Sequence, residues 1–325
     1  MSNITAKILC DSITEGGSRL TTWELTYPRF IHAEIMTHRA FSRNAASSRA
    51  IPTAKLRQRV TDNPAVPLHW GANQKGMQAD IEILDLPGAL AWWFRGRDMM
   101  LKHHEEGEKL GLHKQVVNRV IEPWMMITII CSMTDHANFY HLRNHKDAEP
   151  NFRKLAQLMY DMFMGTPPTF VKPGDWHLPL IDESDHVAAA KLAPNEYGTF
   201  LDGNEDEIFQ TSDWDKKMEI LKKVSTGRCA RVSYLTHDGR RDLLEDVRLH
   251  DQLAATASLG EDPMHASPLE HPAMAVGGRE RHGNFEGWKQ YRKFFPKENG
   301  PSTATRCVGC GHWERGKHVL GCPER

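Results

Sequence analysis

The sequence predicts an α+β fold, in which β-strands and long α-helices alternate along a chain of 325 residues. Three segments lead to this prediction. Residues 19–28 alternate apolar and polar side chains and end at Pro28, which indicates a strand. Residues 87–111 have the pattern of a long amphipathic helix, with Pro87 near its start and Gly111 near its end. Residues 135–163 form a second helical region, interrupted near Pro150.

The remaining segments fit the same fold class. Helix-like spacing of apolar residues follows the first strand, and a helix that breaks at Pro123 leads into a buried apolar segment at 124–133. We expect a loop at 60–76, an excursion rich in Pro, Asp and Gly at 165–215, a helix at 213–224, and a short strand, a turn and a helix over 227–257. Residues 1–295 are expected to form a single domain, followed by a Cys/His tail at 296–325.

Composition narrows the class of protein. The hydrophobic content of 40% and the charged content of 26% are ordinary for a soluble globular protein, and the formal net charge of -1 argues against a nucleic-acid partner. The longest apolar run, residues 124–133, is too short to span a bilayer, and we expect no membrane partner. The N-terminus has no signal-peptide pattern, and Cys10, Cys131 and Cys229 are scattered, so a reducing cytoplasm is expected.

Cations and hydrogen-bond donors are concentrated in THRAFSRNAASSRAIP, residues 37–52. Arginine presents a planar set of donors that matches phosphate and carboxylate oxygens, and small Ala and Ser side chains let an anion approach the backbone. The segment therefore predicts a cradle for a phosphorylated ligand with a flat polar ring. The alternative is an exposed basic loop that pairs with carboxylates.

The order of residues in this segment resembles the signature of the flavin-dependent thymidylate synthases. That signature reads Arg-His-Arg, two residues, Ser, one residue, Asn, Glu, one residue, Ser, one residue, Arg. Six residues fall in register with it: His38, Arg39, Ser42, Asn44, Ser47 and Arg49. Two positions depart, since Thr37 stands where the family has its first Arg and Ala45 stands where it has Glu.

Four further blocks resemble segments of the same family. GLHKQVVNRVIEP resembles its Ala-Arg-x-x-Leu-Pro segment through Arg119 and Pro123, and NFYHLRNHKDAEPNFR resembles its Asn-Phe-x-x-Leu-Arg segment through Asn138 and Arg143. CARVSY at 229–234 and HASPLEH at 265–271 resemble two blocks that precede the signature in the family, whereas here they follow it. The chain therefore resembles a circularly permuted member of the family.

The resemblance implies an antiparallel sheet flanked by long helices, and an enzyme that acts on a pyrimidine deoxynucleotide. Reduced FAD would complete the transfer of a one-carbon unit from methylenetetrahydrofolate to dUMP, giving dTMP, with NADPH as reductant. Carried over by resemblance, the flavin-binding residues are His38, Arg39, Asn138, Ser233 and His265, and the nucleotide-binding residues are Ser47, Arg49, Arg119 and Arg143, of which Arg143 and Ser47 are also the catalytic pair. Family members are tetramers with shared sites, so a homo-oligomer is expected.

Several alternatives stay open at this point. Thr37 and Ala45 make a shifted specificity conceivable, namely methylation or hydroxymethylation of another pyrimidine deoxynucleotide. Residues 284–295 faintly resemble the approach to the signature; either they pack elsewhere, or Arg292 or Lys293 supplies the cation that Thr37 lacks. A third class is a non-enzymatic nucleic-acid-binding module with a zinc tail.

The tail contains a Cys pair of the spacing found in tetrahedral zinc sites. Cys307 and Cys310 flank a Gly-containing turn, and Cys322 with His312 or His318 can complete the site. We expect a structural zinc ion there; the alternative is a set of unligated surface cysteines.

Overall fold

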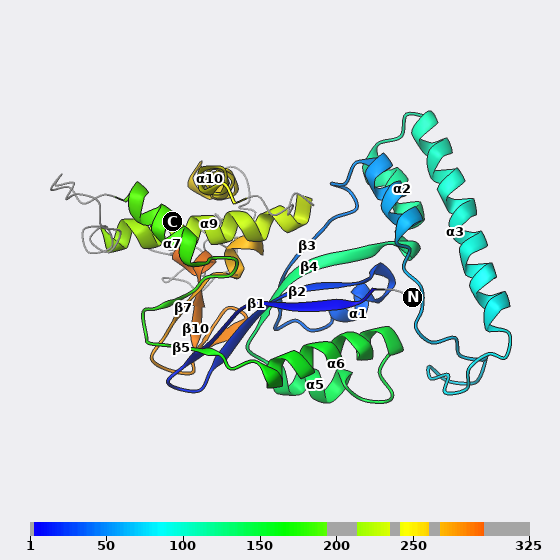
Figure 1. Ribbon diagram of the computed structural model, residues 1–325, viewed down its shortest axis with the longest axis horizontal. Coiled ribbons are helices and arrows are strands. Elements are labelled where there is room, and N and C mark those ends of the chain that lie inside the picture. The colour runs from blue at the N-terminus through cyan, green and yellow to red at the C-terminus, as the bar shows by residue number, and fades with distance from the viewer. Residues whose placement is uncertain (1–2, 194–212, 235–240, 260–266, 296–325) are drawn as a thin grey trace, which may run out of the picture.

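The fold is α+β, in a computed structural model that describes residues 3–193, 213–234, 241–259 and 267–295. Its first sheet has the strand order β3-β4-β2-β1-β5 (Figure 1). The strands are β1 (Thr5–Thr14), β2 (Arg19–Pro28), β3 (Ser42–Ala45), β4 (Met126–Met133) and β5 (Thr169–Val171). The four strands β1 to β4 are antiparallel to their neighbours, and β5 runs parallel to β1. The antiparallel sheet is therefore as expected.

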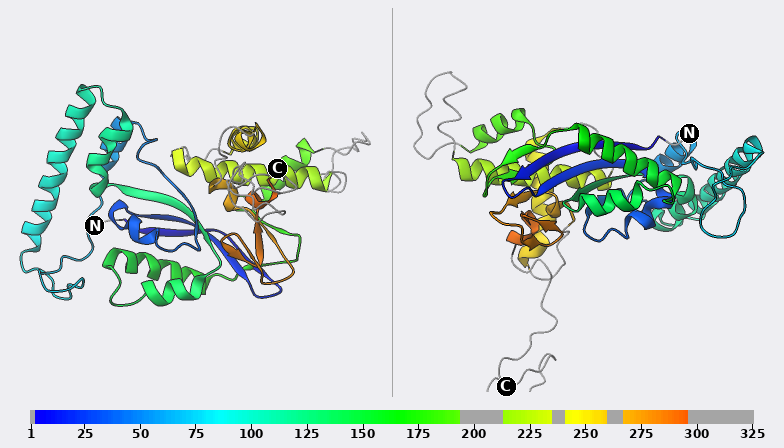
Figure 2. Two further views of the ribbon diagram at one scale, coloured as in Figure 1. Left: turned by 180° about the vertical axis from the view of Figure 1, so that it is seen from behind. Right: turned by 90° about the horizontal axis from the view of Figure 1, so that it is seen from below.

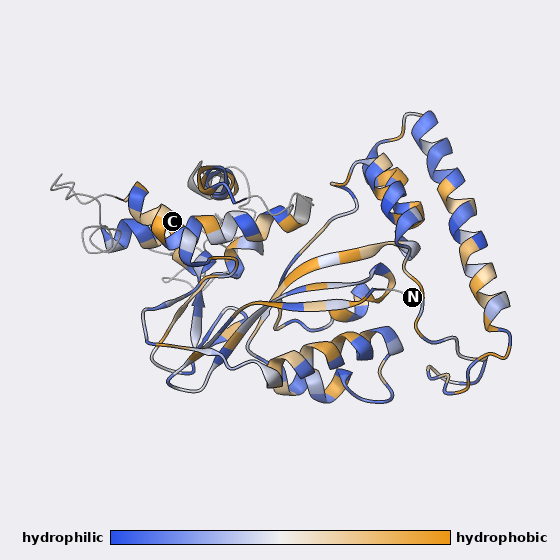
Figure 3. Ribbon diagram, viewed as in Figure 1, coloured by the Kyte–Doolittle hydropathy of each residue, from blue (hydrophilic) through white to orange (hydrophobic). Residues whose placement is uncertain are grey.

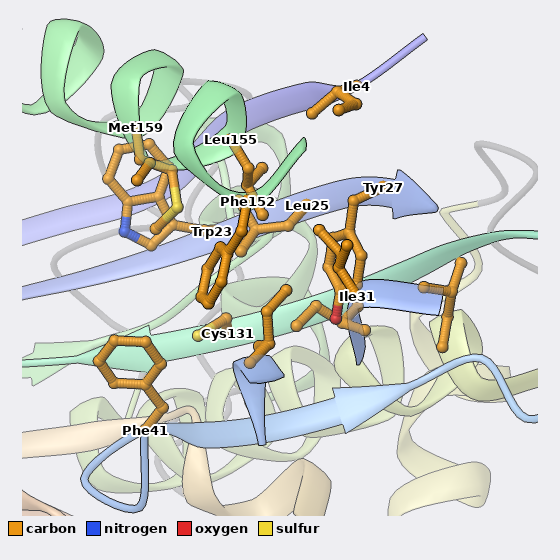
Figure 4. Close-up of a cluster of buried hydrophobic side chains, with 14 of the residues drawn as sticks. Ile4, Trp23, Leu25, Tyr27, Ile31, Phe41, Cys131, Phe152, Leu155 and Met159 are labelled. Atoms are coloured by element: carbon orange, nitrogen blue, oxygen red, sulfur yellow. The ribbon is translucent and has the colours of Figure 1, made fainter. Parts of the chain in front are cut away.

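One face of this sheet carries the main hydrophobic core. Alternate residues of β2, including Trp23, Leu25 and Tyr27, point to this face and pack with Phe152 and Leu155 (Figure 4). The two packed residues belong to α6 (Pro150–Gly165), which follows α5 (His136–Arg143). Burial of this many large apolar side chains supplies the main driving force for folding. Figure 3 shows β4 as mostly hydrophobic, in keeping with its central place in the sheet.

The other face is covered by the later part of the chain. Helix α9 (Trp214–Tyr234) lies against β4, where Cys229 and Val232 pack on Ile130. Helices α7 (Glu183–Leu192) and α10 (Leu243–Leu259) lie beside α9 (Figure 1). Asp185 of α7 and Asp246 of α10 both form ion pairs with Arg228, whose side chain is 4% exposed. These ion pairs fix the three helices relative to one another.

A second, smaller sheet joins residues of the last part of the chain to β6. Its strand order is β6-β7-β10-β8-β9, formed by β6 (Trp176–His177), β7 (Ala273–Ala275), β8 (Arg281–His282), β9 (Phe285–Glu286) and β10 (Trp288–Gln290). The 3-10 helices η3 (Ser267–Glu270) and η4 (Tyr291–Phe294) flank it. Gln290 donates to the hydroxyl of Ser42 over 2.7 Å and to the carbonyl of Glu270 over 3.1 Å. This sheet thus packs against the start of β3.

Helix α3 (Leu86–Lys109) stands at the end of the molecule away from the second sheet (Figure 2). Asp85 caps its N-terminus by accepting a hydrogen bond from Gly88, and Pro87 occupies the first turn. The shorter helices around it are η1 (Arg29–Ile31), α1 (His32–Ile35), α2 (Thr53–Asp62), α4 (Lys114–Val117) and η2 (Asn118–Trp124). Among the described helices none is long and apolar enough to cross a bilayer.

Most sequence-based expectations for the elements are confirmed, and three are wrong. The helix expected to break at Pro123 consists of α4 and the 3-10 helix η2, which continues through Pro123 to Trp124. The strand at 19–28, the helix at 87–111 and the two helices around Pro150 are present. Residues 229–234, expected as a short strand, form the last part of α9. The helix expected after β2 is reduced to η1 and α1, because Arg43 binds the carbonyls of Ile35 and His38 and holds the chain in a turn.

Candidate active site

His38 and Arg143 form the centre of the first group of predicted site residues. Arg143, the last residue of α5, donates from Nε to His38 Nε2 over 2.9 Å, although the two residues are 105 positions apart. A guanidinium can only donate, so Nε2 of His38 carries the lone pair and its proton lies on Nδ1. Burial, together with the charges of Arg143 and Arg43, lowers the pKa of His38 to about 4. His38 is therefore a neutral acceptor that orients Arg143 at neutral pH.

The rest of the Arg143 guanidinium is also held in place. Nη2 donates to Thr37 Oγ1 over 3.3 Å, and Nη1 lies 3.8 Å from a carboxylate oxygen of Glu34. The guanidinium carbon lies 4.8 Å from the centre of the Phe152 ring, a cation–π contact. Burial raises the pKa of Glu34, and the nearby Glu149 raises it further. With 23% of its side chain exposed, Arg143 is an oriented cation that a ligand can reach.

A cavity of about 240 Å³ lies beside this pair. Its lining includes Arg39, Phe41 and Asn138 as well as His38 and Arg143. Arg39 and Asn138 are exposed, and Phe41 is buried with its ring stacked on His38 at 5.3 Å. Four of the predicted site residues, His38, Arg39, Asn138 and Arg143, therefore line one cavity.

A larger cavity of about 980 Å³ adjoins it and shares Asp135 and Asn138. Its lining includes Tyr140, His136 and Phe163. His136 Nδ1 and the Tyr140 hydroxyl have no hydrogen-bond partner among the described residues, although both atoms are buried. The volume lies in the range of small-molecule sites. Flat aromatic walls, amide and guanidinium donors and unpaired polar atoms fit a flavin, which has a flat polar ring and an anionic phosphate chain.

Ser47, Arg49 and Arg119 form a second group at the other end of β3. Ser42 of β3 pairs with Ser132 and Ala45 pairs with Ile129, so His38 and Ser47 flank opposite ends of this four-residue strand. Likewise α5 follows β4 whereas η2, which carries Arg119, precedes it. Arg49 is exposed, and Arg119 is 48% exposed with an ion pair to Glu122 at 2.8 Å. The cavity lined by His38 includes none of these three residues.

The structure also places the remaining blocks of the resemblance. Asn44 donates to the carbonyl of Cys229 over 2.7 Å, so the signature lies against the CARVSY block, whose Ser233 is in the last turn of α9. His265 lies outside the described residues, as do Cys307, Cys310, His312, His318 and Cys322 of the predicted zinc site. Among the described residues no cluster of His, Cys, Asp or Glu is arranged to hold a metal ion.

Of the two departures from the signature, Ala45 packs against the main core, and Thr37 lies beside Arg143. Thr37 contacts Arg143, and its hydroxyl donates to the carbonyl of Glu34 over 2.6 Å. Arg292 lies 2.6 Å from Glu270, within the segment that packs against Ser42, so residues 284–295 have a place of their own. Sequence reasoning missed Glu34, Arg43, Asn118 and Glu122 as neighbours of the predicted site residues. Proximity in the sequence was the signal that they gave: Arg43 lies within residues 37–52, Glu34 lies four residues before His38, and Asn118 and Glu122 lie near Arg119.

No family model matches the sequence, and no curated protein matches it. Among solved structures, the chain is similar to the UMP/dUMP methylase PolB from Streptomyces cacaoi bound with 5-Br UMP, with 16% identity and a TM-score of 0.42. That match covers 51% of this chain and 90% of PolB. The complex of PolB with 5-Br dUMP matches at 14% identity and a TM-score of 0.42, over 51% of this chain and 91% of PolB.

Proposed function

We propose that this chain is a flavin-dependent methyltransferase that converts a pyrimidine deoxynucleotide, dUMP, to dTMP with methylenetetrahydrofolate as the one-carbon donor and NADPH as reductant. The observation that supports this most is the bond between Arg143 and His38. It joins two blocks, each resembling the same enzyme family, at the edge of a cavity that Arg39 and Asn138 also line. Bound FAD would supply the two-electron reduction.

Arg143 is proposed to stabilise charge on the pyrimidine. Negative charge develops on the carbonyl edge of a uracil ring when the carbon at position 5 becomes nucleophilic. An arginine that His38, Thr37 and Glu34 already hold in place needs little reorganisation to meet that charge. His38 stays neutral at neutral pH, so the positive charge of this pair is carried by Arg143. Arg39 and Asn138 are proposed to bind the flavin, as donors to its phosphate and ring.

Ser47, Arg49 and Arg119 are proposed to bind the phosphate of the nucleotide. Arg49 is exposed and has no ion-pair partner among the described residues, which leaves its donors available for an anion. Because His38, which binds Arg143, and Ser47 flank opposite ends of β3, we propose that one nucleotide contacts Arg143 of one copy and Arg49 of another. The proposal therefore includes a homo-oligomer with shared sites.

The test uses the purified full-length chain. We expect it to bind added FAD with an absorbance band that bleaches on reduction, and to release tritium from [5-³H]dUMP in the presence of methylenetetrahydrofolate and NADPH. The mass of the product identifies dTMP, and a parallel reaction with dCMP tests the alternative substrate. A chain that binds no flavin and releases no tritium from either nucleotide would contradict the proposal.

Replacing Arg143 tests its role directly. We expect Arg143→Lys to lower the turnover rate by about 10²–10³-fold, because lysine cannot keep the paired contacts that orient the charge. The matched control is Arg153→Lys on α6, an exposed arginine that donates to the carbonyl of Lys146. Turnover in the control should equal that of the wild type. Equal losses in both variants would show that the effect does not depend on the contacts of Arg143.

A further inference from the structure

The turn at residues 47–51, which carries Ser47 and Arg49, is held from one side by α4 and η2. Asn118 Nδ2 donates to the carbonyls of Ser48 and Ile51, over 2.7 and 2.9 Å. Lys114 donates to the carbonyl of Ala50 over 3.1 Å, and the Ser48 hydroxyl donates to Glu122 over 2.5 Å. Three carbonyls of the turn are therefore bound on the same side, and Asn118, 1% exposed, makes two of these bonds.

The orientation of the Asn118 amide follows from its partners. Both carbonyls can only accept, so the NH₂ group faces the turn and Oδ1 faces His104, whose Nε2 lies 3.0 Å away. His104, on α3, is fully buried, and its Nδ1 faces Arg57 Nη1 at 3.4 Å. An arginine can only donate, so His104 accepts at Nδ1 and donates from Nε2 to Asn118. Every polar atom of the Asn118 side chain thus has a partner.

This arrangement sets the direction of the backbone donors of the turn. The C=O and N–H of one trans peptide point in opposite directions. Since the Ser48 carbonyl faces Asn118, the N–H of Arg49 points away from it. Among the described residues that N–H has no hydrogen-bond partner. Free backbone N–H groups beside an arginine attract anions, so Asn118 leaves one side of the turn prepared for a phosphate.

We propose that Asn118 is a positioning residue for phosphate recognition, acting through the 47–51 turn and itself held by His104. The inference rests on the proposed function, because it takes the phosphate monoester of a nucleotide as the ligand. In the family segment that this region resembles, Ala stands at this position, and Ala cannot make these bonds. The bonds from Asn118 to the turn are therefore a feature of this chain.

Binding of dUMP and of deoxyuridine to the full-length chain, measured by calorimetry, tests the proposal. We expect Asn118→Ala to weaken dUMP binding by about tenfold or more and to leave deoxyuridine binding within about twofold, since only dUMP has the phosphate. The matched control is Asn151→Ala, because Asn151 is also 1% exposed with an amide bonded to Glu149 and to the N–H of Leu68. In the control, the preference for dUMP over deoxyuridine should match that of the wild type.

A second pair of variants separates positioning from folding. His104→Gln keeps a donor that can reach Asn118 Oδ1, whereas His104→Leu leaves that oxygen unpaired in a buried place. We expect the glutamine variant to recover most of the dUMP preference that the leucine variant loses. Hydrogen exchange of the peptide containing residues 47–51 gives a readout without ligand, and it should quicken in Asn118→Ala and not in Asn151→Ala.

The outcomes distinguish the two proposals. A wild-type chain that binds dUMP, together with an Asn118→Ala variant whose preference for dUMP and whose exchange in the turn are unchanged, overturns the role of Asn118 alone. A wild-type chain that binds neither nucleotide nor nucleoside overturns the proposed function, and the phosphate role of Asn118 with it. A loss of preference equal in Asn118→Ala and Asn151→Ala would mean that stability, and not the turn, sets the affinity.

Discussion

At the scale of single residues, a chain of buried polar side chains crosses the first sheet. His271 Nδ1 lies 2.8 Å from Ser132 Oγ, which lies 2.6 Å from Thr22 Oγ1, and Thr22 in turn lies 2.8 Å from His177 Nε2. His177 Nδ1 reaches Ser12 Oγ at 2.9 Å. Burial lowers the pKa of both histidines to about 3, and His271 adds to the shift of His177. Both rings are therefore neutral at neutral pH.

These shifts predict acid sensitivity. The unfolded chain binds protons at these histidines below about pH 6.5 and the folded chain does not, so the free energy of unfolding falls as the pH drops below that value. Each histidine contributes a slope of about 1.4 kcal/mol per pH unit. We expect His177→Gln to reduce the slope between about pH 6.5 and 5, measured by urea unfolding, whereas His145→Gln, with 53% of its side chain exposed, leaves it unchanged. Identical slopes in all three proteins would contradict this.

The spacing of residues within the motifs predicted part of the candidate site. Through their motifs, His38, Arg39, Asn138 and Arg143 resemble site residues of one family. All four line one cavity. The contacts that orient them come from residues such as Glu34 and Arg43, whose partners depend on how the chain turns after α1. Such partners are tertiary contacts, and no local pattern marks them. The distance between Arg143 and Arg49 is likewise a property of sheet topology.

At the scale of elements, the packing of α9 on α10 depends on a glycine. A Cβ placed on Gly227 would lie 2.3 Å from the carbonyl oxygen of Asp246, which is backbone and cannot move without shifting α10. The same crossing contains Arg228 and Arg231, both paired with Asp246, whose side chain is fully buried. A small shift of α10 would therefore also strain buried ion pairs.

Gly227→Ala should destabilise the fold. We expect a loss of about 1–3 kcal/mol in the free energy of unfolding, because the added methyl group overfills a packed helix crossing. Gly165→Ala, near the end of α6, is the control, since a Cβ there meets nothing within 4 Å. It should be neutral or stabilising by up to about 1 kcal/mol. Denaturant unfolding of the two variants checks this, and equal losses would rule out the packing explanation.

The elements that were mispredicted show where local pattern fails. Residues 229–234 contain Val232 and Tyr234, which favour strands, yet they continue a helix because Cys229 and Val232 pack together on Ile130. Strand β1 gave no prediction because Ile8, Leu9 and Cys10 are consecutive, whereas in β2 apolar residues such as Trp23, Leu25 and Tyr27 alternate with polar ones. Long periodic segments such as α3 were predictable because their end signals and their apolar pattern agree.

At the scale of the whole molecule, His38 and Ser47, one from each group of predicted site residues, flank opposite ends of β3. The strand between His38 and Ser47, β3, has four residues and spans roughly 13 Å. In the proposed shared site, one nucleotide contacts the two groups on different copies of the chain. The homo-oligomer, its tetrameric state and the single domain over 1–295 stay predictions.

Mixing variants tests the shared site. We expect Arg143→Ala and Arg49→Ala to be inactive alone, because each removes one half of every site. Mixed oligomers that contain subunits of both variants should regain activity. In these oligomers some sites combine an intact Arg143 of one subunit with an intact Arg49 of another. Tritium release from dUMP measures the recovery, and light scattering reports the assembly. A mixture that exchanges subunits and stays inactive would place both arginines in one subunit's site.

The first sheet ends on both sides in very short strands, of four residues in β3 and three in β5. A longer free edge would offer a row of main-chain donors and acceptors to any passing strand, which is how amyloid-like fibres begin to grow. Strands β3 and β5 themselves offer few such groups, whereas β5 pairs only with Ser12–Thr14 of β1, and Thr5–Asp11 of β1 has no strand on that side among the described residues. An added strand would therefore find its longest run of main-chain partners in this sheet beside Thr5–Asp11 of β1, and not at β3 or β5.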